Sequence, residues 1–363
     1  MARGWSKLRI ALVALLTVVA LLAAYLLLWP VPIDPVAWTP PPAPRLEGVY
    51  APNDRLAAVE RVPAGGVGPE DVAIDGQGRI VAGLADGRIV RMGSEGAAFE
   101  VLATTGGRPL GLHHDAAGNL IVADAVKGLL SVSPTGELKV LATEHGGRPF
   151  KFTDDVDIAA DGTIYFSDAS WRWGIREVIE DVLEHRPYGR LLAYEPATGE
   201  VRLLADGLYF ANGVAVAADE SFVLVNETTS YRVMRHWLDG ERAGQTEVLV
   251  DNLPGMPDGI SRGSDGRFWI ALFTPRVPDL DAMMPRPWLR KVVYRLPRFL
   301  QPAPVRHAFV LSIDERGQVL DNLQHRGGGS FSPITSVQEH DGWLYLGSLE
   351  RPHVARLPLP PRP

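Results

Sequence analysis

One phrase recurs along the chain beyond residue 60: a leading turn, an apolar alternating strand, a turn with Asp or Gly, and a second strand. It occurs six times, as GPEDVAIDGQGRIVAGLADGRIVRM, RPLGLHHDAAGNLIVADAVKGLLSVSPTGELKVL, FTDDVDIAADGTIYFSDAS, FANGVAVAADESFVLVNETTSYRVMRHWL, MPDGISRGSDGRFWIALFTPR and ITSVQEHDGWLYLGSLERPHVARLPL. The first four units are spaced by about 40–60 residues, which suits one four-stranded blade each. A β-sandwich would not repeat one phrase six times. We therefore expect an all-β fold, a six-bladed β-propeller over residues 46–363.

The N-terminal stretch adds a second constraint. Residues 10–29 form an uncharged run, IALVALLTVVALLAAYLLLW, and about 20 residues are enough for a helix to cross the hydrocarbon core of a membrane. Basic residues precede the run, so the positive-inside rule predicts a cytoplasmic N-terminus, residues 1–9, and a body on the periplasmic or other extracytoplasmic side. A cleaved signal peptide is the alternative, although its apolar core is shorter, about 7–15 residues. We expect a single-pass transmembrane anchor.

The segment after this run, residues 30–45, is dense in proline. Proline restricts the backbone and favours an extended chain. We therefore expect a semi-rigid linker that holds the folded domain off the bilayer.

Two insertions interrupt the blade spacing, and both have helical periodicity. In the first, WGIREVIEDVLEHRPYG, the apolar residues fall on one face of a helix. In the second, residues 285–300, one face is formed by Trp288, Leu289, Val292, Val293 and Leu296, and Arg290, Lys291, Arg295 and Arg298 fall elsewhere. Basic amphipathic helices bind anionic membrane surfaces, so this segment is a candidate for membrane contact. The alternative is packing on the propeller rim, and in either arrangement the helices can roof a central site as lids.

Composition excludes several classes of function. The formal charge of −7 argues against nucleic acid as a partner, because phosphate binding needs clustered Lys and Arg. The chain has no cysteine, and so no disulfide, no thiolate nucleophile and no Cys-type zinc site. It also lacks the G-x-S-x-G signature of serine esterases. Any chemistry must therefore come from other groups.

The leading turns carry those groups. In a propeller the segment before each innermost strand opens onto the central channel, so equivalent positions of different blades meet in space. The chain places Glu70, Asp154 with Asp155, Asn212 and Asp258 there, in GPED, FTDD, FANG and MPDG. Carboxylate and amide oxygens without His or Cys suit Ca²⁺ and fit Zn²⁺ badly. One such residue alone would be interpreted as a turn cap, but four at one phase of a repeat indicate a Ca²⁺ site.

These motifs, in this order, resemble a known family. FTDDV with YFSDAS, FANGVAV with NETTSYRV, LPGMPDGI, RPWLRKVVYRL and VQEHDGWLYLGSLERPHVARL look like those of the strictosidine synthase-like and adipocyte plasma membrane-associated protein family. That family lies within the superfamily of gluconolactonase (SMP-30) and paraoxonase, the calcium-dependent six-bladed propellers. The resemblance covers nearly the whole chain. It implies that the catalytic calcium is held by a Glu, two Asn-type residues and an Asp from separate blades, which fall here on Glu70, Asp154, Asn212 and Asp258.

The chain departs from the family pattern at three places. Asp154 replaces the usual Asn, which adds a negative charge and is expected to tighten cation binding while weakening the Lewis acidity of the metal. The glutamate used by plant strictosidine synthase falls at Thr335 or Ser336, so the alkaloid-forming condensation is not expected. The paraoxonase histidine falls at Leu110, and His113 with its neighbour His114 lies beyond that position.

We interpret the chain as a membrane-anchored, calcium-dependent hydrolase of lactones or aryl esters. The metal would polarise the carbonyl group and stabilise the oxyanion. Asp155, beside a ligand but not needed as one, is the candidate general base. The alternative from another class is a non-catalytic propeller that binds a protein or small ligand around a structural calcium. The sequon at Asn226 would carry a glycan only in a eukaryotic secretory route.

Overall fold

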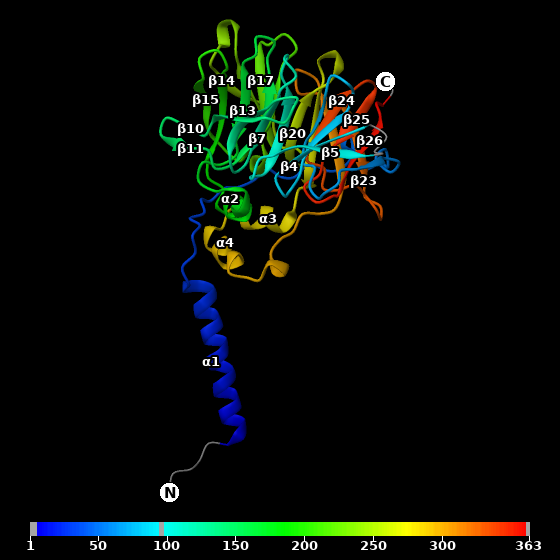
Figure 1. Ribbon diagram of the computed structural model, residues 1–363. Coiled ribbons are helices and arrows are strands. Elements are labelled where there is room, and N and C mark those ends of the chain that lie inside the picture. Colours follow the sequence, from blue (N-terminus) through cyan, green and yellow to red (C-terminus); the bar gives the residue numbers. More distant parts are fainter. Residues whose placement is uncertain (1–5, 94–97, 361–363) are drawn as a thin grey trace.

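Six four-stranded antiparallel sheets form a β-propeller, as the repeat predicts (Figure 1). The computed structural model describes residues 6–93 and 98–360. In each blade the strand after the leading turn is the first of the sheet, and in the first five blades the chain then crosses the sheet strand by strand.

The first blade contains β2 (Val72–Ile74), β3 (Ile80–Gly83), β4 (Arg88–Met92) and β5 (Phe99–Thr104). The second contains β6 (Pro109–His114), β7 (Leu120–Asp124), β8 (Gly128–Val132) and β9 (Leu138–Ala142). The third contains β12 (Thr153–Ile158), β13 (Ile164–Asp168), β14 (Gly189–Glu195) and β15 (Glu200–Leu208). The fourth contains β16 (Ala211–Val216), β17 (Phe222–Glu227), β18 (Arg232–Trp237) and β19 (Thr246–Val250). The fifth contains β20 (Gly255–Arg262), β21 (Phe268–Pro275), β22 (Ala308–Ile313) and β23 (Val319–His325). A short ribbon, β10 (Glu144–His145) with β11 (Arg148–Pro149), precedes the third blade. Short 3₁₀ turns cover Gly48–Tyr50, Ile175–Glu177, Thr228–Ser230, Gly240–Arg242, Ser264–Gly266 and Arg298–Leu300.

The sixth blade closes the ring with strands from both ends of the domain. It contains β24 (Val337–His340), β25 (Trp343–Leu346) and β26 (His353–Pro358), and β1 (Glu60–Pro63) pairs antiparallel with β26 as its outermost strand. The pairing covers the edge that β26 would otherwise expose. Because β1 precedes the first repeat in the chain, this contact ties the beginning of the propeller to its end.

Apolar side chains between adjacent blades form the core. One cluster joins Ala73 and Val81 of the first blade to Leu112 and Val122 of the second. Both faces of these strands are covered, which is why strands such as β3 and β21 are apolar over most of their length.

Three helices from the two insertions cover one end of the propeller, and together we call them the helical cap (Figure 1). They are α2 (Val178–Glu184) from the third blade, and α3 (Pro278–Met283) and α4 (Pro287–Tyr294) from the fifth. Leu183, Leu280 and Val293 pack in one apolar cluster between these helices and the blades. The prediction of two helical insertions is confirmed.

The prediction for the faces of α4 is wrong at Arg290. Arg290 was expected on the polar side, but it is fully buried, whereas Trp288 is 60 % exposed. The guanidinium group of Arg290 donates to the backbone carbonyls of Leu183, at 2.8 Å, of Glu184 and of Val36. These acceptors come from distant parts of the chain, so periodicity within the helix could not reveal them.

The N-terminal helix α1 (Lys7–Leu28) has no buried residue and extends away from the cap (Figure 1). Among the described residues it is the one helix long and apolar enough to cross a membrane, which makes it a candidate anchor. It contacts the body at its C-terminal end, where Arg295 donates to the carbonyls of Leu26 and Trp29 and Tyr25 donates to the carbonyl of Arg295. Arg295 thereby satisfies carbonyl groups that a helix end leaves without partners.

The proline-rich segment is extended, as expected, but it does not stand clear of the domain. Ile33 is 2 % exposed, and Pro35 is also buried. The backbone N–H groups of Val36 and Trp38 donate to the carbonyls of Glu184 and Met284, both at 3.2 Å. We call residues 31–42 the strap, because this segment fastens α2 to α4 instead of acting as a spacer.

Candidate metal centre in the central channel

The predicted ligand positions come together at the centre of the ring. Glu70 precedes β2, and Asp154, Asn212 and Asp258 lie in β12, β16 and β20. All four side chains are buried, with 4 to 6 % exposure. Glu70, Asp154 and Asn212 line a cavity of about 90 Å³ between the inner strands, and the Asn212 side chain hydrogen-bonds to Asp258. Leading turns up to 188 residues apart in the numbering thus form one polar site.

A local irregularity aims these side chains at the channel. The pairing of the inner strand with the second strand shifts register between Thr153 and Val156, between Ala211 and Val214, and between Pro257 and Ile260. Each shift encloses a predicted ligand and the residue after it. Bulges of this kind redirect a side chain out of the regular alternation, so the ligands do not follow the in-and-out pattern of the strands around them.

The residue after each ligand lies against the next blade. A side chain at Gly259 would place its Cβ 2.6 Å from the carbonyl oxygen of Thr335, which explains glycine there. In two other blades the residue directly after the predicted ligand is an aspartate. The Asp71 carboxylate accepts the backbone N–H of Leu112 at 2.9 Å, and the Asp155 carboxylate accepts that of Val214 at 2.8 Å. These two aspartates therefore fasten one blade to the next.

Both carboxylate oxygens of Asp155 accept hydrogen bonds. One accepts the N–H of Val214 in the next blade, and the other accepts the N–H of Val156 at 2.8 Å. Burial, and then the charge of Asp71, raise the pKa of Asp155 well above its ordinary value. The structure thus places Asp155, the candidate base, in the channel beside Asp154. The sequence did not indicate its hydrogen bond to the next blade, at Val214. Its assignment as a general base stays a prediction.

The three carboxyl groups among the predicted ligands, those of Glu70, Asp154 and Asp258, are buried without enough positive charge nearby to balance them. Burial is the largest cause that raises the pKa of Glu70 and of Asp154, and the Asp258 carboxylate raises both further. Burial raises the pKa of Asp258 to about 7, although the hydrogen bond from Asn212 opposes this shift. Three buried carboxylates that disfavour one another's ionisation are stable as anions only with a cation among them.

The donor chemistry fits a hard cation. One oxygen of Asp154 is buried and has no hydrogen-bond partner among the described residues. Three carboxylates and one amide are oxygen donors of the kind Ca²⁺ takes. In the described ranges, no group of three or more His, Cys, Asp or Glu is already arranged to hold a metal ion. The donors are therefore collected here, but they would have to close around an ion.

Three further residues build the site and were not predicted to do so. Arg108 is buried; its guanidinium group donates to the carbonyl of Gly68 at 2.9 Å, and its charge lowers the pKa of Glu70. Asn226 donates to the carbonyl of Asp258 at 2.6 Å, and Thr228 donates to that of Pro257. The motifs RPLGL and NETTSYRV contained these residues, but nothing in their spacing showed which turns they would hold.

The structure decides two other sequence interpretations. Asn226 is fully buried in β17, so its sequon cannot accept a glycan in the folded protein. Thr335 and Ser336, the predicted positions of the family glutamate, both donate their hydroxyl groups to the carbonyl of Glu70.

Leu110, the predicted position of the paraoxonase histidine, and His113 both lie in β6 but have different surroundings. Leu110 is 2 % exposed and packs with Phe152 and Phe210 on the cap side. His113 lies further along β6, where its Nδ1 is 3.1 Å from a carboxylate oxygen of Asp157. His113 therefore lies on the same channel wall but not at the phase of the ligands.

Comparison with known proteins shows two matches to family models. Residues 154–241 match the strictosidine synthase family, and residues 48–92 match the N-terminal part of strictosidine synthase-like proteins. Both matched ranges contain predicted ligands, Glu70 in one and Asp154 with Asn212 in the other.

Curated relatives align over most of their length. The human adipocyte plasma membrane-associated protein is 37 % identical over 371 residues, covering 95 % of this chain and 88 % of that protein. Strictosidine synthase-like protein 10 of Arabidopsis thaliana is 37 % identical over 338 residues, covering 83 % of this chain and 90 % of that protein.

Solved structures share the fold at low sequence identity. A gluconolactonase from Xanthomonas campestris superposes with a TM-score of 0.62 at 18 % identity, covering 84 % of this chain and 91 % of the other. Regucalcin, a calcium-binding protein from Agrobacterium tumefaciens, gives a TM-score of 0.58 at 16 % identity, with 82 % and 92 % covered. These neighbours support the propeller architecture.

Proposed function

The chain belongs to the family of strictosidine synthase-like and adipocyte plasma membrane-associated proteins, and on that basis we propose that it is a membrane-anchored, Ca²⁺-dependent hydrolase of small-molecule esters or lactones. The observation that carries the proposal is the set of three buried carboxylates, Glu70, Asp154 and Asp258, whose pKa values are all raised. The gluconolactonase and calcium-binding descriptions of the structural neighbours support the same choice of metal and reaction.

In this proposal Glu70, Asp154, Asn212 and Asp258 would hold the ion, which would supply Lewis-acid polarisation of a carbonyl group. Asn212 donates to Asp258 and so orients that carboxylate toward its neighbours. Arg108 keeps the turn of Glu70 in place through the carbonyl of Gly68. The four ligand positions are buried, and buried charges interact more strongly than charges in water.

Asp155 is the proposed general base for the attacking water. Its raised pKa brings the carboxylate closer to the range in which a base works at neutral pH. Each of its oxygens accepts one backbone N–H and retains a second lone pair, so the group can still accept a proton from water.

A second candidate function rests on the same contacts. Because one oxygen of Asp155 holds β12 to β16 and the other accepts the N–H of its own neighbour Val156, the cation could serve only to neutralise and pin the ring. The protein would then be a non-catalytic, membrane-tethered propeller that binds a ligand or another protein. A strictosidine synthase-like condensation has less support, since Thr335 and Ser336 offer no carboxylate.

The test is hydrolysis of a panel of lactones and aryl esters by the full chain, in Ca²⁺ and then in chelator. We expect turnover that chelator removes and added Ca²⁺ restores. Absence of turnover, with Ca²⁺ still raising the melting temperature, would reject the hydrolase and support the binding propeller. Unchanged melting in chelator would reject the cation site itself.

A further inference from the structure

A second cavity, of about 200 Å³, lies beneath the helical cap. Its walls are apolar: Ile179 and Val182 of α2, Leu280 of α3 and Val293 of α4 face Phe210 and Met256 of the propeller. The threonines in its lining turn their hydroxyl groups to backbone carbonyls, Thr228 to Pro257 and Thr274 to Pro275. An apolar cavity of about 150 Å³ is enough to hold a molecule of benzene, so this one has room for a segment of hydrocarbon.

This cavity is directly on the cap side of the candidate metal centre. Phe210 and Met256, which line the cavity, stand two residues before Asn212 and Asp258 in the chain. The ring of Phe152, two residues before Asp154, packs edge-on against that of Phe210 with centroids 5.3 Å apart. An apolar layer therefore lies immediately next to the buried carboxylates. The two cavities share no lining residue in the part of the chain that the structure describes, so a ligand that reaches both must displace this layer, with a hydrocarbon segment under the cap and a polar, hydrolysable group at its end.

The cap is also the part of the body next to α1. Arg295 at the end of α4 holds the C-terminal carbonyls of α1, and Figure 1 shows α1 leaving the molecule on the side of α2, α3 and α4. With α1 in a bilayer, the cap lies at the lipid headgroups. Large apolar side chains are exposed there: Trp288 is 60 %, Phe299 84 % and Leu300 57 % exposed. Phe299 and Leu300 immediately precede residues 301–304, which form one wall of the cavity.

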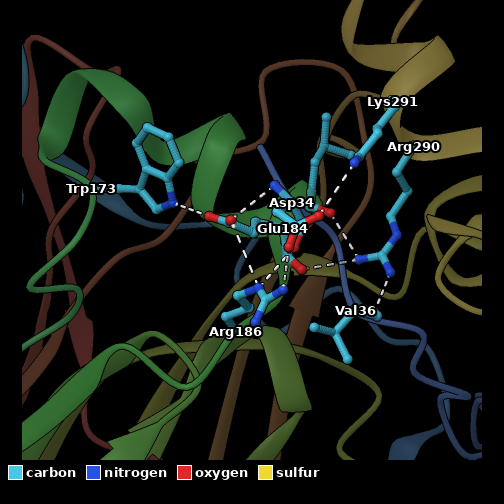
Figure 2. A network of polar contacts seen from close by, with 8 residues as sticks. Asp34, Val36, Trp173, Glu184, Arg186, Arg290 and Lys291 are labelled. Carbon is cyan, nitrogen blue, oxygen red and sulfur yellow. Dashed lines mark hydrogen bonds and ion pairs between the residues drawn. The ribbon is translucent and has the colours of Figure 1, made fainter. Parts of the chain in front are cut away.

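The strap fixes this arrangement. Asp34 forms ion pairs with Arg186, at 2.6 Å, and Lys291, at 3.3 Å, and its backbone N–H donates to Glu184 (Figure 2). The strap continues directly from α1, so the anchor and the roof of the cavity are joined within a few residues. The fold therefore holds the cavity close to the membrane end of the anchor.

We propose that the cavity beneath the cap binds the hydrocarbon chain of an amphiphile that partitions into the bilayer, and presents the ester or lactone at the end of that chain to the metal centre. The binding of the chain stands on the cavity and its place beside α1. The statement about the ester or lactone rests on the proposed function. The experiment below separates the two.

The direct test uses the full chain in phospholipid nanodiscs, with a diazirine-bearing stearate as the photoreactive probe. We expect cross-links on peptides of α2 and of residues 301–304. The Val182→Trp substitution fills the cavity and is expected to lower that labelling about tenfold. Ala303→Trp adds the same bulk from an exposed wall position and protects the test if Val182→Trp disturbs folding. Val140→Trp, on the outer strand β9 where Val140 is 51 % exposed, is the matched control.

A kinetic arm uses 4-nitrophenyl esters from acetate to octanoate. In the parent, kcat/KM is expected to rise about fourfold per added methylene, because each buried CH₂ contributes about 0.8 kcal/mol. The rise should be flat in Val182→Trp and unchanged in Val140→Trp. Labelling confined to α1, or equal in parent and both cavity variants, would overturn the proposal even if esters are hydrolysed. Cavity-dependent labelling without hydrolysis would support the chain site and reject the hydrolase.

Discussion

The channel centre and the helical cap both bury ionisable groups, but these groups differ in whether they have partners of opposite charge or polarity. In the cap, the buried guanidinium group of Arg290 has backbone carbonyls from α2 and the strap as partners. In the centre, Glu70, Asp154 and Asp258 have one another and a single nearby guanidinium group, that of Arg108. Charge that already has partners holds a structure together, whereas charge that lacks them marks a place for a ligand.

The largest expected effect tests whether the centre is incomplete without a cation. At Ca²⁺ about 1,000-fold above its Kd, the proposed binding should stabilise the parent by about 4 kcal/mol. Glu70→Gln combined with Asp258→Asn should remove this gain and also abolish turnover. In chelator the double variant should melt above the parent, because it no longer holds repelling carboxylates.

The matched control for that variant removes two exposed acids, by Glu241→Gln with Asp279→Asn, which changes the net charge equally. Thermal unfolding with Ca²⁺ and with chelator measures both pairs. Equal calcium shifts in the two double variants would contradict the metal centre.

The next effect separates chemistry from fastening within the centre. Asp155→Asn is expected to lower turnover roughly 100-fold or more, as loss of a general base does, while Ca²⁺ still raises the melting temperature. Asp71→Asn is the natural control, since Asp71 makes the same contact between blades. If the two variants lose stability alike and turnover is the same in both, Asp155 is a fastening residue and its role as base is wrong.

The third prediction concerns the pH dependence of stability, which tests whether Asp181 and His185 are buried in their neutral forms. Burial raises the pKa of Asp181 to about 7 and lowers that of His185 to about 3. The aspartate therefore contributes stability at low pH that is lost as pH rises from about 4 to 7. The histidine contributes stability above about 6.5 that is lost as pH falls toward 3. Between about pH 4 and 6.5 the two slopes oppose each other.

Single variants should expose each slope. Relative to the parent, Asp181→Asn is expected to gain stability with rising pH, and His185→Gln to lose it, by up to about 1.4 kcal/mol per pH unit. Thermal unfolding at about pH 4.5 and 6.5 measures this, with the exposed Asp279→Asn as control. Parallel pH profiles for all four proteins would mean that neither group is held neutral.

The smallest effect concerns the strap. Arg290→Met keeps the length of the side chain but leaves the carbonyls of Leu183, Glu184 and Val36 without their donor, which should cost about 2 kcal/mol. Hydrogen exchange should accelerate in residues 31–38 and in α2, while Ca²⁺ binding at the centre stays as in the parent. Arg286→Met, at the exposed N-cap of the same helix, controls for loss of charge. Slower Ca²⁺ binding or lost metal affinity in Arg290→Met would show that cap and centre are not independent.

The repeat predicted the propeller, its inner strands and the phase of Glu70, Asp154, Asn212 and Asp258, because strand alternation and turn residues act over short stretches of chain. Periodicity also located both helical insertions. It failed at Arg290 and for the strap, where the deciding contacts cross 100 residues or more. The fastening role of Asp155 depends on a bulge that aims its carboxylate at the next blade, and no local pattern marks it.

The sequence by itself therefore determined the blades, the apolar N-terminal helix and the oxygen-rich positions of the leading turns, since each follows from the chemistry of neighbouring residues. Only the tertiary structure decided which groups became partners. Ring closure by β1 and β26 brings the leading turns together around the channel, and the helices that the strap holds together line an apolar cavity on the cap side. Burial and pairing depend on distances between segments far apart in the chain, which only the closed ring sets.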